Sequence, residues 1–255
     1  MTSVETSINY FSPPTDGSKP YLWTAGNLPN GALRRNWEPL PHNVQVQNIQ
    51  GQESSLNYKL DTTGFEFHRI PNKANINFDD EANIRRKYYT ECTDNIKSIT
   101  RASRVLIFDH TLRKSRSPGS PEVTDNRPAP VKLVHVNQSN ESAKQHVHLY
   151  LPESEVPTLL SKRFQIINLW RPVSNPASRC PLALCDFRSV RAENSVPFTL
   201  KYQNRDDEAL VFSFDSLQDK SVATFAPHTA IDDSTIPSDA PDRQSIEIYA
   251  LVFYD

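Results

Sequence analysis

Short apolar runs, rich in β-branched and aromatic residues, make up much of the second half of the chain, and clusters of proline, asparagine, aspartate or serine separate them. Runs of this length and composition predict β-strands. A similar run comes earlier, at residues 104–108, and the run at residues 131–137 alternates polar and apolar residues. The predicted strands are 104–108, 131–137, 164–170, 182–187, 198–202, 209–214, 221–225 and 245–254.

A helical pattern occurs in two places. Between residues 79 and 100, apolar side chains recur every three or four positions, which predicts an amphipathic helix. A second helical stretch is interrupted by prolines, so we predict helices at 141–150 and 153–162. The segment 113–130 holds four prolines and is predicted to be a loop.

Residues 1–55 are rich in Pro, Asn, Gly and Ser with scattered aromatic residues, which indicates an extended N-terminal arm that packs on the core. The 255 residues suit one domain, 1–255, with a single sizeable core. Many short strands after a helix predict a mainly β protein with flanking helices (α+β), either a sandwich or a jelly roll, with the helices on one side.

Composition narrows the possible partners. The formal net charge is −2 and the pI is about 6.4, which disfavours nucleic acid. No apolar run is long enough for a membrane span, and the N-terminus lacks the pattern of a signal peptide, so we expect a cytoplasmic protein that does not bind membranes. Cys92, Cys180 and Cys185 lack a paired spacing and are expected to remain free thiols that serve in packing.

His135 and Asn137 are two residues apart on a predicted strand, so their side chains leave the same face. His228 lies between two strand-like runs, where a neighbouring strand could bring it beside them. Two imidazoles and one oxygen ligand on adjacent strands can hold non-haem iron and leave positions open for co-substrate and oxygen. His146 and His148 form a second candidate pair of metal ligands by their spacing. They lie in a predicted helix, however, where residues two apart point away from each other.

Arg243 and Ser245 enter the last predicted strand fifteen residues after His228. A guanidinium and a hydroxyl on one strand face can hold a carboxylate, here the distal carboxylate of 2-oxoglutarate. Each of these signals is weak when taken alone, because an isolated histidine is more often a surface or core residue.

The chain resembles the fungal and bacterial CmcJ/AsaB/NvfI-type family of non-haem iron, 2-oxoglutarate-dependent oxygenases of secondary metabolism. The resemblance covers about 190 residues in a fixed order of motifs: 65–71 (FEFHRIP), 102–113 (ASRVLIFDHTLR), 134–139 (VHVNQS), 163–172 (RFQIINLWRP), 181–186 (PLALCD), 214–216 (FDS), 227–229 (PHT) and 243–248 (RQSIEI). This order is far more specific than any single motif.

The resemblance implies a double-stranded β-helix (jelly roll) that binds Fe(II) through His135 and His228. It also implies that Arg243 and Ser245 anchor 2-oxoglutarate as co-substrate. Arg171, in the Trp-Arg-Pro motif, is a second candidate for holding a carboxylate, or else it forms a salt bridge beneath the site. No catalytic residue is expected beyond the metal site.

The chain departs from the family pattern at two positions. The pattern has aspartate where this chain has Asn137, and usually a basic residue where it has Tyr249. An amide is a weaker, neutral oxygen donor, so affinity for iron should fall. The Asn137 amide could still bind a metal, or it could be an introduced substitution that inactivates the site. The protein could also have lost oxygenase activity altogether. The alternative that we rank last is a halide bound in the coordination position that the carboxylate would occupy.

We therefore expect an enzyme that oxidises a small natural-product intermediate by hydroxylation, desaturation or ring formation, with Asn137 in the position of the acidic ligand. The alternative is a metal-independent isomerase, cyclase or lyase, or a non-catalytic binding protein, on the same fold. The expected partner is a small molecule, and a long N-terminal arm makes a homodimer possible.

Overall fold

The computed structural model describes residues 2–23, 28, 31–53, 55–71, 76–115, 127–191, 195–201, 206–209, 214–215 and 222–255. Its strands are β1 (Thr2–Ser12), β2 (Tyr21–Trp23), β3 (Glu38–Asn48), β4 (Arg104–Lys114), β5 (Phe164–Pro172), β6 (Leu182–Leu184), β7 (Phe198–Lys201), β8 (Asp206–Ala209), β9 (Phe214–Asp215), β10 (His228–Ala230) and β11 (Gln244–Phe253). Its helices are α1 (Leu60–Thr63), α2 (Glu81–Asn83), the π-helical turn η1 (Ile84–Tyr88), α3 (Tyr89–Thr100), α4 (Asn140–Tyr150), α5 (Val156–Leu160) and the 3-10 turn η2 (Phe187–Ser189).

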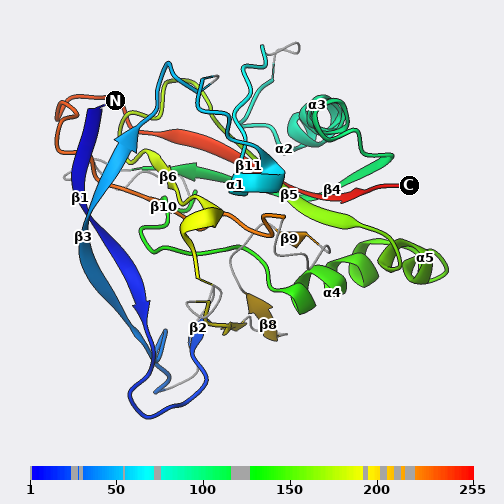
Figure 1. Ribbon diagram of the computed structural model, residues 1–255, viewed down its shortest axis with the longest axis horizontal. Coiled ribbons are helices and arrows are strands. Elements are labelled where there is room, and N and C mark those ends of the chain that lie inside the picture. The colour runs from blue at the N-terminus through cyan, green and yellow to red at the C-terminus, as the bar shows by residue number, and fades with distance from the viewer. Residues whose placement is uncertain are drawn as a thin grey trace.

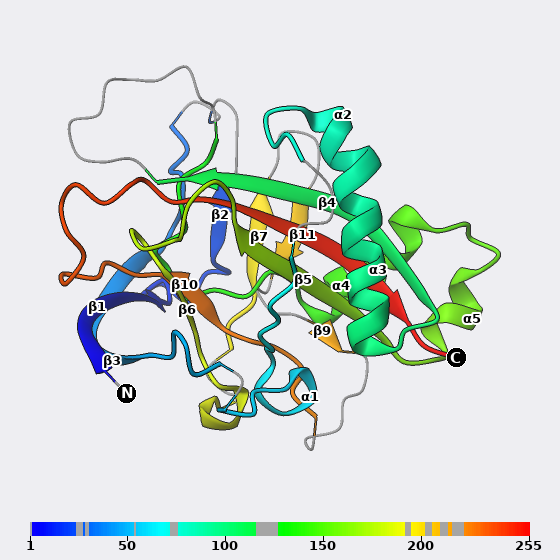
Figure 2. The same ribbon diagram turned by 90° about the horizontal axis from the view of Figure 1, so that it is seen from above.

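A four-stranded antiparallel sheet, in the order β4-β11-β5-β9, forms the centre of the molecule (Figure 1). β11 lies inside this sheet, between two long neighbours, and its residues are buried or nearly so because both of its faces are covered. Its even-numbered residues, such as Ile246, Ile248 and Ala250, face the helix α3. Figure 2 shows α3 crossing over β4, β11 and β5.

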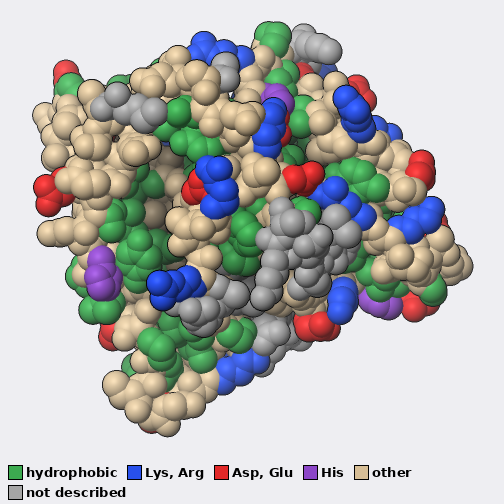
Figure 3. All heavy atoms as spheres, in the orientation of Figure 1, with side chains coloured by type: hydrophobic (Ala, Val, Ile, Leu, Met, Phe, Trp, Pro, Cys, Tyr) green, Lys and Arg blue, Asp and Glu red, His purple; other side chains and the backbone are tan. Residues whose placement is uncertain are grey.

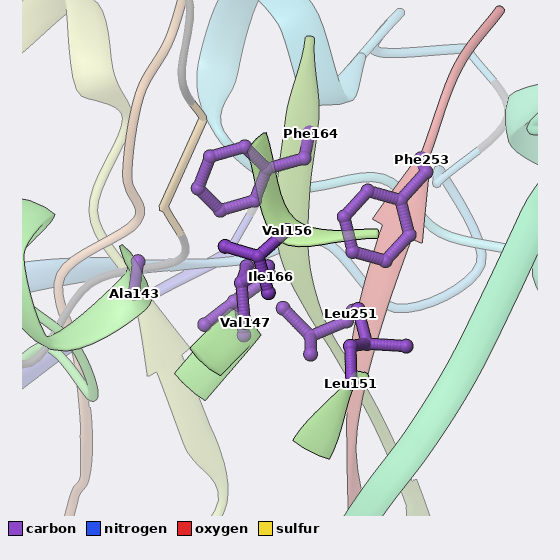
Figure 4. Close-up of a cluster of buried hydrophobic side chains, with 8 residues drawn as sticks. All are labelled: Ala143, Val147, Leu151, Val156, Phe164, Ile166, Leu251 and Phe253. Atoms are coloured by element: carbon purple, nitrogen blue, oxygen red, sulfur yellow. The ribbon is translucent and has the colours of Figure 1, made fainter. Parts of the chain in front are cut away.

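The other face of the sheet packs against α4 and α5 at the carboxyl end of β11. Leu251 and Phe253 of β11 meet Phe164 and Ile166 of β5 there, and Val147 of α4 joins them (Figure 4). Helices therefore cover both faces of the sheet, and the prediction that they lie on one side is wrong. The reason is that α4 and α5 also carry an apolar stripe, which must be buried somewhere.

Residues 2–48 contain more regular structure than an extended arm suggests. β1 and β3 pair antiparallel from Thr2↔Asn48 to Ser12↔Glu38, and β2 pairs in parallel with β7. In Figure 1 the β1–β3 pair lies along the left edge of the molecule. The Val134 amide donates to the Asn9 carbonyl at 2.9 Å, so β1 supports the segment that leads to His135.

The predicted helices 79–100, 141–150 and 153–162 are confirmed, with the first one crossing the turn η1 and the last one shortened to α5. Two predicted strands are wrong. Residues 222–225 form no strand, and 131–137 makes isolated bridges in place of a continuous strand. β4 continues to Lys114, beyond the predicted end at 108. The predicted strand 209–214 lies largely outside the described residues.

Among the described residues, no helix is long and apolar enough to cross a bilayer. The face seen in Figure 3 carries lysine, arginine and acidic side chains interspersed with one another. This mixture agrees with a formal net charge of −2. Cys92 is buried, and Cys180 and Cys185 are partly buried, each as a free thiol.

Candidate metal and co-substrate site

His135 and His228 lie side by side. Their backbones exchange two hydrogen bonds, each at 3.1 Å, in an isolated antiparallel bridge. In such a pair the side chains leave the same face, and the ring centroids are 4.5 Å apart. β10 begins at His228 and pairs with β6, which fixes this second histidine from its other side.

The two imidazoles have the same hydrogen-bonding arrangement. Nδ1 of His135 lies 2.6 Å from the Leu133 carbonyl, and Nδ1 of His228 lies 3.0 Å from the Ala226 carbonyl. A carbonyl oxygen only accepts, so Nδ1 carries a proton in both rings, and in a neutral ring Nε2 then keeps its lone pair. Histidines that bind metals usually donate their other ring nitrogen to such a carbonyl or to a carboxylate.

The pKa of His135 is held well below its ordinary value, chiefly because the ring is buried. The neighbouring His228 lowers this pKa further. A neutral imidazole at physiological pH is the form that binds a metal. The donor set of the two histidines therefore fits a divalent transition metal.

A cavity opens beside this pair. Its volume is about 30 Å³, which is enough for an ion or a water. The side chains that line it are Arg113, Val131, His135, Trp170, Leu182, His228, Ala230, Arg243 and Glu247.

Three neighbouring strands supply the charged and aromatic part of this lining. β11 pairs Ser245 with Arg113 of β4, and Glu247 with Trp170 of β5. Paired residues share a face of the sheet, and residues two apart on a strand do too. The odd-numbered residues of β11 therefore lie on the face of the sheet that carries the cavity, whereas Ile246 and Ile248 lie on the face covered by α3.

Arg243 is 3% exposed and is held by three hydrogen bonds. Its amide donates to Ser115 Oγ at 2.7 Å, its Nε donates to Ser245 Oγ at 3.2 Å, and its Nη1 donates to the Cys180 carbonyl at 2.6 Å. Burial lowers the pKa of this guanidinium to about 10, so it stays protonated at neutral pH. The structure thus brings Arg243 and Ser245 together, as expected.

Asn137 lies two residues beyond His135, with Val136 between them pointing into the core. Its Nδ2 donates to Oε1 of Glu247 at 3.2 Å. Asn137 is not among the residues that line the cavity, whereas Glu247 is. Ser139 then caps α4 by accepting from the Ser142 amide at 3.0 Å, which anchors this motif to the helix.

Arg171 is not brought to the cavity. It pairs with Ile246 and therefore lies on the face of the sheet that packs against the helix. Its guanidinium carbon lies 6.0 Å from the Tyr88 ring centroid. The structure thus places Arg171 outside the residues that line the cavity, on the face where a structural contact was the alternative expectation.

Three charged or aromatic cavity residues were not predicted from the sequence: Glu247, Trp170 and Arg113. The signal for Glu247 was present, because Arg243, Ser245 and Glu247 continue one period-two series. Arg113 donates from Nη1 to the Ala129 carbonyl at 3.1 Å. Within the described residues, no group of three histidine, cysteine, aspartate or glutamate side chains lies close enough to hold a metal ion.

Paired imidazoles beside an arginine-lined cavity are an arrangement that could bind a metal and a carboxylate. A family model described as "Oxidoreductase/YMDC permease-like domain" matches residues 8–213 and 203–253. The chain therefore belongs to this oxidoreductase family, and the resemblance to the CmcJ/AsaB/NvfI type is confirmed.

Curated relatives agree with this family. The chain is 33% identical to "Hydroxylase/desaturase CTB9" of Cercospora beticola and 30% identical to "Hydroxylase/desaturase efuI" of Hormonema carpetanum, each over 74% of this chain. These matches span only 58% and 63% of the two relatives' own length. "Fe(II)/2-oxoglutarate-dependent dioxygenase nvfI" of Aspergillus novofumigatus is 26% identical, over 95% of this chain and 94% of the relative.

Among solved structures, the "iron and alpha-ketoglutarate-dependent endoperoxidase NvfI with different conformation" superposes with a TM-score of 0.83. The match covers 99% of this chain and 98% of that one, at 23% identity. This likeness shows that the two chains share a fold, mainly sheet with few helices.

Proposed function

We propose that the chain is an Fe(II)- and 2-oxoglutarate-dependent oxygenase with a double-stranded β-helix (jelly-roll) core. It oxidises a small natural-product intermediate by hydroxylation, desaturation or ring formation. The observation that carries the proposal is the pair of imidazoles with free Nε2 lone pairs, which shares one cavity with a buried arginine. The printed names of the relatives supply the cofactor and the reaction class.

His135 and His228 would hold the iron, with the Asn137 amide oxygen as third donor. Iron with bound 2-oxoglutarate supplies the power to activate oxygen and oxidise an unactivated carbon. The protein residues bind, orient and shield the reactants from water. The cytoplasm as location, and a possible homodimer, remain predictions.

Arg243 would bind the distal carboxylate of 2-oxoglutarate, with Ser245 fixing the guanidinium through its contact to Nε at 3.2 Å. Arg113 adds a second positive charge to the lining of the same cavity. Trp170 adds an indole N–H that is buried and has no hydrogen-bond partner within the described residues. A ligand carboxylate would satisfy this donor.

The test is co-substrate turnover by the iron-loaded protein. We expect succinate to form from 2-oxoglutarate when Fe(II) and oxygen are supplied, and His228→Ala to abolish it. His42→Ala is the matched control, because His42 lies in β3 rather than at the cavity. Failure to take up iron and to form succinate, even with candidate substrates present, would overturn the proposal.

The second candidate is a metal-independent catalyst in the same cavity. It is favoured by one observation: among the described residues, no three acidic, thiol or imidazole side chains are grouped closely enough for a metal. An activity that survives chelators and His228→Ala would establish this alternative.

A further inference from the structure

Asn137 and Glu247 are in direct contact, and the chemistry of the contact fixes the orientation of the amide. An ionised carboxylate only accepts hydrogen bonds, so the atom of Asn137 that faces Oε1 of Glu247 at 3.2 Å must be Nδ2. The other end of the amide, Oδ1, then points away from Glu247. Its lone pairs are directed away from this carboxylate.

Three donors hold the Glu247 carboxylate itself. Oε1 also accepts from Nδ2 of Asn168 at 2.9 Å, and Oε2 accepts from the Tyr249 hydroxyl at 3.1 Å. Burial raises the pKa of Tyr249, so the phenol stays protonated and remains a donor. Tyr249 is in turn near Thr111 Oγ1, at 3.3 Å. Glu247 is 9% exposed and its position is defined on both oxygens.

We propose that Glu247 is the positioning residue of the metal site: it fixes the Asn137 amide with Oδ1 free to bind a divalent metal, and it supplies the negative charge that an aspartate ligand would have carried. The inference rests on the proposed function. If Glu247 has this role, its effect on metal affinity depends on which residue occupies position 137. Beside Asn137 the carboxylate is a hydrogen-bond partner, whereas beside an aspartate it would be a like charge at close contact.

The experiment is a double-mutant cycle on metal affinity. Co(II) binding is measured by calorimetry and by its d–d absorption for the wild type, Glu247→Gln, Asn137→Asp and the double variant, with anaerobic Fe(II) as a second probe. In the Asn137 background, Glu247→Gln should weaken Co(II) binding about tenfold and change the d–d spectrum. In the Asn137→Asp background, the same change should leave affinity equal or raise it, because glutamine can donate to the new carboxylate.

Each other outcome is decisive. An equal loss in both backgrounds would mean that Glu247 acts only as a distant charge, and no loss in either would mean that it has no role; both overturn the inference and leave the iron proposal standing. Absence of metal binding in all four proteins would overturn the proposed function and this inference together. Thermal unfolding without metal checks that each variant folds.

If Glu247→Gln does not fold, Tyr249→Phe decides the question. It removes the donor to Oε2 and leaves the charge in place. We expect Co(II) affinity to fall about threefold in the Asn137 background, because the carboxylate is then less well fixed. Unchanged affinity would overturn the positioning role.

Discussion

Trp170 lines the cavity that we assign to 2-oxoglutarate, and its buried N–H has no partner among the described residues. Trp170→Phe removes this donor and keeps an aromatic ring next to Arg243, whose guanidinium carbon lies 5.1 Å from the ring centroid. Because a hydrogen bond to a charged group is lost, we expect affinity for 2-oxoglutarate to fall about tenfold. Calorimetric titration of 2-oxoglutarate into the Co(II)-loaded protein measures it. Co(II) affinity should be unchanged, and unchanged 2-oxoglutarate affinity would exclude Trp170 from the site.

His135 makes the stability of the metal-free protein depend on pH. Its folded-state pKa is depressed below the ordinary value of 6.5 by burial and by His228. The unfolded chain therefore binds a proton that the folded chain does not, and the free energy of unfolding should fall as the pH drops below 6.5.

The measurement is urea unfolding between about pH 5 and about pH 8, with His135→Asn as comparison. The wild-type slope should exceed that of the variant by up to about 1.4 kcal/mol per pH unit. Equal slopes would show that His135 titrates normally in the folded protein.

At the residue scale the sequence allowed part of the site to be predicted. The structure brings His135 beside His228 and Arg243 against Ser245, while their roles as metal ligands and co-substrate anchor stay predictions. Glu247 could have been found, since it continues the alternation of its strand, but its contact with Asn137 depends on pairing between segments 110 residues apart. For Arg171 the sequence left two roles open, because a motif does not say which face of a strand a residue occupies.

At the scale of elements, Gly64 ends α1 with φ +84°, and a Cβ there would lie 2.2 Å from the Phe225 carbonyl oxygen. Phe225 precedes Ala226, whose carbonyl accepts the Nδ1 proton of His228. Gly64→Ala should therefore destabilise the fold and disturb the site. Gly51→Ala is the control, because Gly51 has φ +79° and a Cβ placed there would meet nothing within 4 Å.

Both substitutions carry the strain of a left-handed backbone, about 1 kcal/mol. Only Gly64→Ala adds the overlap with Phe225, so its loss in the free energy of unfolding should be larger by about 2 kcal/mol or more. Urea unfolding of the two variants measures the difference. Equal losses would contradict the close approach of α1 to the His228 segment.

Helices were predicted more reliably than strands, and the reason is physical. The segment 79–100 contains its own apolar stripe, which is local information. The segment 131–137 has a strand pattern, but β-pairing requires partners from elsewhere, and in the structure His135 bridges His228, far along the chain. β4 also continues past residue 108, paired with β11, and the register of this pairing shifts between Tyr249 and Ala250. Such a shift depends on the partner strand as well as on the local sequence.

At the scale of the whole molecule, the mainly β class with flanking helices could be predicted, while the distribution of helices over both faces could not. Apolar stripes on α3 and α4 say that each is buried, but not against which side of the sheet. Because of that arrangement, the two faces of β11 have different roles. Its even-numbered residues hold α3, and its odd-numbered residues build the cavity at one end and the α4 core at the other.

We propose that His135 and His228 hold one iron ion, with Asn137 as a neutral third donor. This is tested by anaerobic titration of the metal-free protein with Fe(II), monitored by calorimetry, and by elemental analysis of the iron that remains bound after gel filtration. We expect one Fe(II) per chain in the wild type and none retained in His228→Ala, with both proteins folded. Equal iron retention by the two proteins, or none by either, would contradict it.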